Sequence, residues 1–120
     1  MIGKFFAITA LGVSMLALPA SASDFERVET KAEFDRVIVG RKAVASWGWV
    51  ISQPNGTVVG QVDGEKAAGS WEWKNGFWCR TISFGSKDMP HDCQAVFHKG
   101  STAIFIRDKG QGDQVVLTLQ

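Results

Sequence analysis

The residues with the most obvious chemical potential are two cysteines and the polar side chains near them. Cys79 and Cys93 are fourteen positions apart, which is too far for a C-x-x-C redox pair. Two cysteines are also too few for a structural zinc site. His91, Asp92 and His98 lie nearby in the sequence, but no helical spacing organises them as ligands. We therefore expect no metal, and the cysteines remain available to each other.

Sequence patterns of common enzymes are also missing. Ser83, Ser86 and Ser101 lack the G-x-S-x-G context of a hydrolase nucleophile. The stretch 110–112 begins a G-x-G pattern, but it leads into an expected strand and not into the helix of a dinucleotide-binding unit. We expect no catalytic residue and no cofactor, and keep an enzyme of unrecognised chemistry as an alternative.

One hairpin can be predicted in register. The pair Asn75-Gly76 is typical of a two-residue turn, in which both positions need positive φ. Such a turn places Trp71 opposite Arg80, and Trp73 opposite Trp78. Residues that face each other across a hairpin share one face of the sheet. This face is rich in apolar side chains, so we predict that it is the core face and that it includes the arginine.

An arginine on a core face needs compensation for its charge. The guanidinium can pair with a carboxylate, stack on an indole ring or face a water-filled pocket. We favour a structural Arg80 held by Trp71 and by a carboxylate such as Asp92. A ligand-binding arginine in the wall of a pocket is the alternative.

Tryptophan is the other unusual feature, because the chain has five tryptophans and no tyrosine. A buried tryptophan removes a large apolar area from water. The alternation of these residues along the expected strands favours core packing. Stacking on a sugar or on a partner is the alternative.

The elements that must position these residues begin with one short helix. Thr30 and Glu33 have the spacing of a capping box, and Gly40 is placed to end the helix. Between them, one apolar stripe is formed by Phe34, Val37 and Ile38. A helix of this length is marginal alone, so we expect it to pack on the rest of the domain.

The remainder of the sequence predicts a mainly β fold. Turn signals separate roughly seven short strands, at 43–53, 57–62, 68–74, 77–84, 93–98, 102–107 and 114–119. In the first of these, one face is expected to carry Ala45, Trp47, Trp49 and Ile51. Tight turns imply antiparallel neighbours in sequence order. The predicted fold is a meander that forms a small barrel or a strongly bent sheet.

The inner face of the segment 92–107 stays open at this point. One face would carry Cys93, Ala95, Phe97, Ile104 and Ile106, and its apolarity marks it as core. The other would carry Asp92, Gln94, Val96, His98, Ala103, Phe105 and Arg107. A disulfide to Cys79 requires Cys93 on the outer face, against the apolarity. Either a bulge or a helix that covers the outer face would reconcile the two.

The N-terminus is typical of a signal peptide. Lys4 precedes an apolar stretch, which Pro19 ends, and Ala20-Ser21-Ala22 supplies the small residues that a signal peptidase reads. We predict a signal peptide at 1–22, a segment with the short helix at 23–41, and a β domain at 42–120. Removing the signal from the 120 residues leaves 98, which suits one domain.

Export has consequences for the cysteines and for partners. In a periplasmic or secreted protein we expect a Cys79–Cys93 disulfide between neighbouring strands. The mature chain would carry equal numbers of acidic and basic residues and no charge run, so we expect no nucleic-acid partner. We also expect no membrane insertion after the signal is removed.

Three stretches, GSWEWKNGFWCRTISFG, DCQAVFHKG and RDKGQGDQVVL, resemble a family of small exported α-proteobacterial proteins of unknown function. The family signature, W-x-W-x-x-G-x-x-C-R followed by a later Cys-Gln, matches residues 71–80 and Cys93-Gln94. The resemblance covers most of the chain from about Phe25 onward. It implies a disulfide, a family position at Arg80 and a periplasmic address, and it supplies no catalytic residues. The candidate ligand or structural cluster is then Arg80, Trp71, Trp73, Trp78, Asp92 and Gln94.

Members of such families often carry the label dihydrodipicolinate reductase, which we consider wrong for this chain. That enzyme needs a nucleotide-binding βαβ domain, and a 98-residue exported meander has no room for one. We expect a non-enzymatic periplasmic domain that binds a small ligand or a protein partner. A protease-inhibitor-like barrel that acts through its N-terminal segment is a further alternative. A closed apolar lumen with an opening would favour ligand binding, and a loose N-terminal segment would favour the inhibitor.

Overall fold

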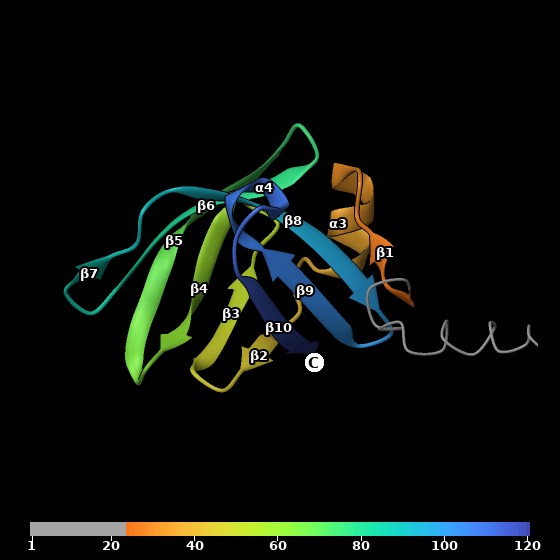
Figure 1. Ribbon diagram of the computed structural model, residues 1–120. Coiled ribbons are helices and arrows are strands. Elements are labelled where there is room, and N and C mark those ends of the chain that lie inside the picture. The colour runs from red at the N-terminus through yellow and green to blue at the C-terminus, as the bar shows by residue number, and fades with distance from the viewer. Residues whose placement is uncertain (1–23) are drawn as a thin grey trace, which may run out of the picture.

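The computed structural model describes residues 24–120, so the predicted signal peptide lies outside the described residues. These residues form a closed antiparallel barrel of eight strands, with two short strands outside it (Figure 1). The helices are α3 (Lys31–Val37) and the very short α4 (Arg107–Gly110). The strands are β1 (Glu26–Arg27), β2 (Ala43–Ala45), β3 (Gly48–Ser52), β4 (Thr57–Val62), β5 (Glu65–Lys74), β6 (Phe77–Phe84), β7 (Lys87–Asp88), β8 (Asp92–Lys99), β9 (Thr102–Ile106) and β10 (Gln114–Leu119). None of the helices in this part of the chain is long and apolar enough to cross a membrane.

The barrel closes between β6 and β8. From β8 the neighbouring strands are β9, β10, β2, β3, β4, β5 and β6, and β6 then pairs with β8 again. This seam consists of the pairs Trp78–Gln94, Cys79–Cys93 and Arg80–Asp92. Beyond the seam, β1 pairs with the same edge of β8. The prediction of a mainly β barrel with a short N-terminal helix and one disulfide is confirmed.

The helix α3 covers one end of the barrel. Its start follows the predicted capping box, since the Thr30 hydroxyl accepts a hydrogen bond from the Glu33 N–H at 3.1 Å. Phe34 is fully buried, with its ring centroid 5.1 Å from that of Trp71 on β5 and 6.5 Å from that of Phe105 on β9. Because β6 and β8 lie between β5 and β9 in the sheet, Phe34 connects two strands of the barrel that are not neighbours.

The prediction of one strand over 43–53 is wrong. This segment is a hairpin of β2 and β3, in which Ala45 pairs with Gly48 around a Ser46-Trp47 turn. Gly48 has φ +143°, and a Cβ there would lie 2.0 Å from a carbonyl oxygen of β4. The chain therefore reverses where the backbone of the next strand approaches too closely for any side chain.

This hairpin also changes the predicted face. Trp47 lies at the turn and lines the interior, whereas Trp49 pairs with Val44 on the outer surface. The Lys42 ammonium lies 4.5 Å from the centroid of the Trp49 ring. The expected shared face of Trp47 and Trp49 is therefore not formed, because a turn between two residues breaks their alternation.

The structure shows which face of the segment 92–107 is the inner one, and it is the face that agrees with the disulfide. Cys93 lies opposite Cys79 on the outer face and is bonded to it. Val96 and Phe105 pair across β8 and β9 and are both buried inside the barrel. The outer face is apolar too, because Ala95 is covered by the α4 turn at Gly110. Apolarity alone could not distinguish two faces that are both buried.

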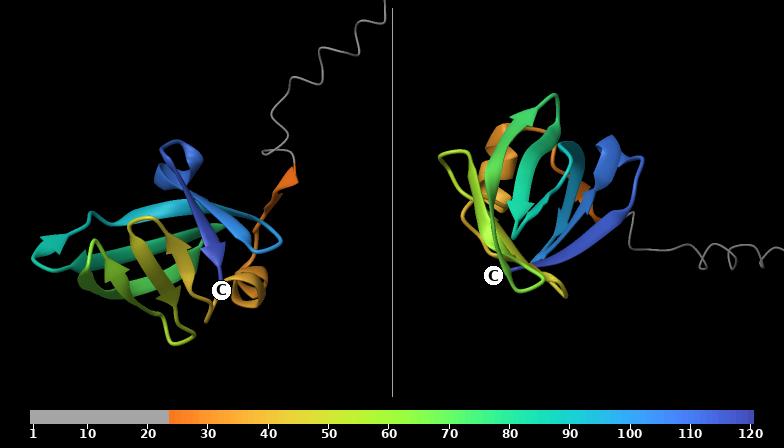
Figure 2. Two further views of the ribbon diagram at one scale, coloured as in Figure 1. Left: turned by 90° about the horizontal axis from the view of Figure 1, so that it is seen from below. Right: turned by 90° about the vertical axis from the view of Figure 1, so that its left-hand side faces the viewer.

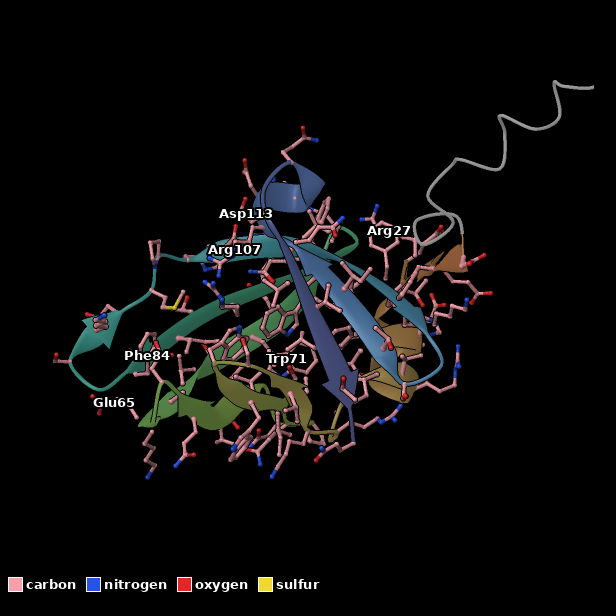
Figure 3. The ribbon with its side chains drawn as sticks, turned by 60° about the horizontal axis from the view of Figure 1, so that its bottom comes forward. Arg27, Glu65, Trp71, Phe84, Arg107 and Asp113 are labelled. Atoms are coloured by element: carbon pink, nitrogen blue, oxygen red, sulfur yellow. A yellow bond between two sulfur atoms is a disulfide. The ribbon has the colours of Figure 1, made fainter. Side chains whose placement is uncertain are left out.

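The turns divide between two ends of the barrel. At the end that α3 covers, which we call the α3 end, lie the turns at 53–56, 75–76 and 100–101. At the other end, which we call the loop end, lie 46–47, 63–64, 85–91 and 107–113. Figure 3 shows Phe84 and Glu65 at one side of the molecule and Arg27 at the opposite side, with Trp71 between them. The right-hand view in Figure 2 faces the strands from the side away from α3.

Candidate functional site

A pocket of about 290 Å³ occupies the interior of the barrel. It extends from Ile38, directly after α3, to Trp47, Phe84 and Met89 at the loop end. Every barrel strand except β5 contributes to its wall, and most of the wall is apolar. The volume is at the lower limit of the roughly 300–1,000 Å³ that is usual for small-molecule sites.

Arg80 lies in the wall of this pocket, in the middle of β6, and is only 4% exposed. Its Nη1 donates a hydrogen bond to the Pro90 carbonyl at 2.6 Å. A guanidinium has five N–H donors, and the other four of Arg80 have no hydrogen-bond partner among residues 24–120. A buried positive charge with unused donors therefore borders the pocket.

Burial lowers the pKa of the Arg80 guanidinium; the Asp92 carboxylate raises it, and the charge of Arg107 lowers it further. The group nevertheless stays protonated at neutral pH, because an arginine does not lose its proton in proteins. The local environment thus disfavours the charge of Arg80 without removing it.

The carboxylate next to Arg80 accepts hydrogen bonds from other groups. Asp92 is the register partner of Arg80 across the seam. Its Oδ1 accepts a hydrogen bond from the Asp108 backbone N–H at 3.1 Å, and its Oδ2 accepts one from the Gln94 amide at 2.8 Å. In the described chain Arg80 forms no ion pair within 4.0 Å and lies over no aromatic ring. The contacts to Trp71 and Asp92 that a structural role would use are therefore not formed.

Positive charge predominates around the pocket. The charged residues that line it are Arg41, Arg80, Arg107 and Asp63. Arg107 begins the α4 turn at the loop end and is half-buried (Figure 3). Trp78 adds an indole N–H that is buried and lacks an acceptor among the described residues. The interior thus offers several hydrogen-bond donors and few acceptors.

The candidate cluster from the sequence divides into two parts. Trp78, Arg80 and Gln94 line the pocket, and Asp92 orients Gln94 from the same strand. Trp71 and Trp73 instead pack against Phe34 at the α3 end, with centroid distances of 5.1 and 5.0 Å. The Trp71 indole N–H donates to the Gln53 carbonyl at 2.9 Å. These two tryptophans therefore hold the helix and do not line the pocket.

Several pocket residues were not predicted as site residues. Trp47 was placed on a strand face and not at a turn, and Met89 gave no sequence signal because it lies in an expected loop. Arg107 was predicted on the same face as Gln94 and Phe105, and all three line the pocket. If the face with Gln94 and Phe105 had been taken as the inner face, Arg107 would have been predicted as a pocket residue.

Two groups of potential metal ligands come together in the described chain, but both are engaged otherwise. The ligand atoms of Cys79, His91 and Cys93 lie within 4.8 Å of one another, yet the two sulfur atoms are bonded to each other. The second group is formed by Glu26, Glu33 and His98. There Glu33 accepts a hydrogen bond from the Glu29 N–H at 3.0 Å, as part of the start of α3. Neither group favours a metal over these contacts.

No protein-family model, curated protein or solved structure matches the chain. The resemblance to a family of small exported proteins therefore stays a prediction. The site itself must carry any conclusion about function.

Proposed function

We propose that this protein is a non-enzymatic binding protein that holds a small, largely apolar ligand inside its barrel. The observation that carries the proposal is the pocket of about 290 Å³, which α3 covers at one end and which reaches the loops at the other. Barrels of eight strands have an interior that is either filled by side chains or wide enough for one small ligand.

The size of this space argues against an ordinary packing defect. Protein interiors are packed nearly as densely as organic crystals, with few voids larger than a water molecule. The space here is about 290 Å³ and is open at the loop end, so it is far larger than such a void and is a pocket that a ligand can enter. A space of this size is better explained as a binding site.

The lining favours binding over catalysis. Its charged groups are three arginines and the carboxylate of Asp63, with no histidine, cysteine or second carboxylate lining it in the part of the chain that the structure describes. General acid–base catalysis uses a positioned group that gives or takes a proton near neutral pH, which arginine does not. An enzyme is the second class of function that we consider, but we identify no proton donor and acceptor for it among the residues that line this pocket.

The N-terminal segment fits a structural role. β1 pairs with β8, and Val28 is fully buried with its N–H bonded to the Val96 carbonyl at 2.8 Å. A protease-inhibitor-like protein would need a loose segment before the helix, but residues 26–28 are held against the barrel. We therefore propose that the partner is a small ligand and not another protein. We also propose a periplasmic or secreted location, because the disulfide suits an oxidising compartment.

The proposal can be tested with N-phenyl-1-naphthylamine, a neutral apolar dye that fluoresces strongly in apolar sites. β10 offers a matched pair of variants, because Val115 lines the pocket and the adjacent Val116 is 56% exposed on the outer face. We expect saturable binding to the wild type and to Val116→Trp, and a loss of roughly tenfold or more in affinity for Val115→Trp, which fills the pocket. Urea unfolding of both variants checks that they fold.

Equal affinity of the two variants would place the dye outside the barrel and would contradict the proposal. A wild-type protein that shows no saturable binding would contradict it as well.

A further inference from the structure

We infer that the pocket selects an amphiphile with a compact oxyanion head group, which Arg80 and Arg107 bind while its apolar body lies in the lumen. This inference rests on the proposed function and names the ligand class of the same site. It follows from the charges that line the pocket and from the hydrogen bonds that they lack.

The first argument is the unused capacity of Arg80. Arg80 is only 4% exposed, yet its side chain makes one hydrogen bond within the described chain, to the Pro90 carbonyl. A buried charge that is not paired and not fully hydrogen-bonded is costly. The guanidinium presents its free donors in a planar fork, which suits the two oxygens of a carboxylate or a similar oxyanion. A bound anion would supply the acceptors that the protein does not.

The second argument is that Asp92 makes no direct ion pair with Arg80, although its negative charge favours the protonated guanidinium. Both oxygens of Asp92 already accept hydrogen bonds, one from the Asp108 N–H and one from the Gln94 amide. These two contacts hold Asp92 without a direct ion pair to the arginine. The arrangement keeps the guanidinium available, whereas a purely structural arginine would use this carboxylate directly.

The third argument is the second arginine. Arg107 lines the same pocket, and its charge acts on Arg80. Like charges that approach each other in a partly buried site are unfavourable, and an anion between them reverses the sign of that interaction. Two arginines that line the same pocket and repel each other therefore favour an anionic group there.

The position of Arg80 suggests how the ligand lies. Inner-face residues of β6 follow each other as Trp78, Arg80 and Ile82 from the α3 end toward the loop end. Arg107 and Pro90 both belong to the loop end. We therefore place the head group on the loop-end side of the pocket and the apolar body against Trp78, Phe105 and Leu117.

The test uses ligands with one apolar body and different head groups. Nonanoate, octyl sulfate, 1-octanol and octylamine each carry an unbranched octyl chain, and their dissociation constants can be measured by displacement of N-phenyl-1-naphthylamine at neutral pH. We expect nonanoate or octyl sulfate to bind roughly tenfold or more tightly than 1-octanol, which corresponds to about 1.4 kcal/mol, and octylamine to bind most weakly. The two anions together distinguish a carboxylate site from a sulfate or phosphate site.

Variants separate the role of Arg80 from general effects on the barrel. In Arg80→Met the preference for the anion over 1-octanol should disappear while 1-octanol itself binds as before. Arg107→Met, at a more exposed position, should reduce the preference independently, in case the first variant folds poorly. Arg36→Met removes an exposed arginine of α3 outside the pocket and should retain the full preference.

The outcomes distinguish the two proposals. If 1-octanol binds saturably and the anions bind no more tightly, the inference about the head group is wrong and the binding function stands. If the preference persists in both pocket variants, the two arginines are not the anion site. If neither the dye nor any of the four compounds binds saturably, the proposed function itself fails.

Discussion

Reduction of the Cys79–Cys93 disulfide should destabilise the barrel strongly, because this bond lies in the seam where the sheet closes. The seam between β6 and β8 contains three registered residue pairs, and the disulfide is the middle one. On each side of it lie Trp78–Gln94 and Arg80–Asp92, which belong to the pocket wall or orient it. The bond therefore connects the closure of the barrel to the site inside it.

The magnitude follows from the length of the loop that the bond closes. The cysteines are separated by 14 positions. A disulfide that closes a loop of about 15 residues reduces the entropy of the unfolded chain by an amount that is worth roughly 3 kcal/mol. Since 1 kcal/mol shifts the melting temperature of a domain of this size by about 4–8 °C, we expect a decrease of roughly 12–24 °C on reduction.

The assay is urea unfolding followed by tryptophan fluorescence, with and without a phosphine reductant. Trp71 at the α3 end and Trp78 in the pocket wall are buried, so unfolding exposes both and changes the total tryptophan fluorescence. The control is the double variant Cys79→Ala/Cys93→Ala, whose stability should not respond to the reductant and should be close to that of the reduced wild type. If the oxidised and reduced wild type differ by less than about 0.5 kcal/mol, the seam closes without the disulfide and this reasoning is wrong.

Two further predictions concern single side chains. Phe34→Ala should lower the free energy of unfolding, measured in urea, by about 3–5 kcal/mol, because Phe34 is fully buried among aromatic rings. The control is Val116→Ala, at a 56% exposed position, which should change this free energy by less than about 0.5 kcal/mol. Equal effects of the two would mean that α3 does not close the barrel. Arg80→Met should change the free energy of unfolding by less than about 1 kcal/mol, because Asp92 retains both of its hydrogen-bond donors. A loss of 3 kcal/mol or more by the same measurement would show that Arg80 is mainly structural.

The β5–β6 hairpin could be predicted residue by residue because its determinants are local. Asn75 and Gly76 have φ values of +53° and +87°, as a two-residue turn of this kind requires. The observed pairs Trp71–Arg80 and Trp73–Trp78 are the predicted ones. The start of α3 at Thr30 was predictable for the same reason, since its capping contacts lie within one turn of helix.

The β2–β3 hairpin was missed because its turn carries no such signature. Ser46-Trp47 contains neither glycine nor asparagine, and the glycine that permits the reversal follows the turn at Gly48. The alternation of tryptophans across this stretch then favoured one continuous strand. The requirement for Gly48 comes from the neighbouring strand β4, which approaches it closely. That contact is not local, so the sequence of the hairpin alone does not reveal it.

The pocket depends on closure of the barrel, which the sequence indicated only in part. The cysteine pair correctly predicted that β6 and β8 are neighbours, and this brought Arg80 and Gln94 to one site. Arg107 joins them only because β9 follows β8 with its inner face set by that seam. The covered outer face of β8 concealed this face in the sequence, because Ala95 is as apolar as the residues inside.

The location of a bound ligand tests the central claim most directly. In a protein with labelled methyl groups, nuclear Overhauser effects between N-phenyl-1-naphthylamine and the protein report which side chains touch the dye. We predict contacts to the inner methyl groups of Ile82, Val115 and Leu117, which line the pocket. Contacts confined to the exposed Val116 on the outer face, with none to these three, would contradict the account of the barrel interior as a binding site.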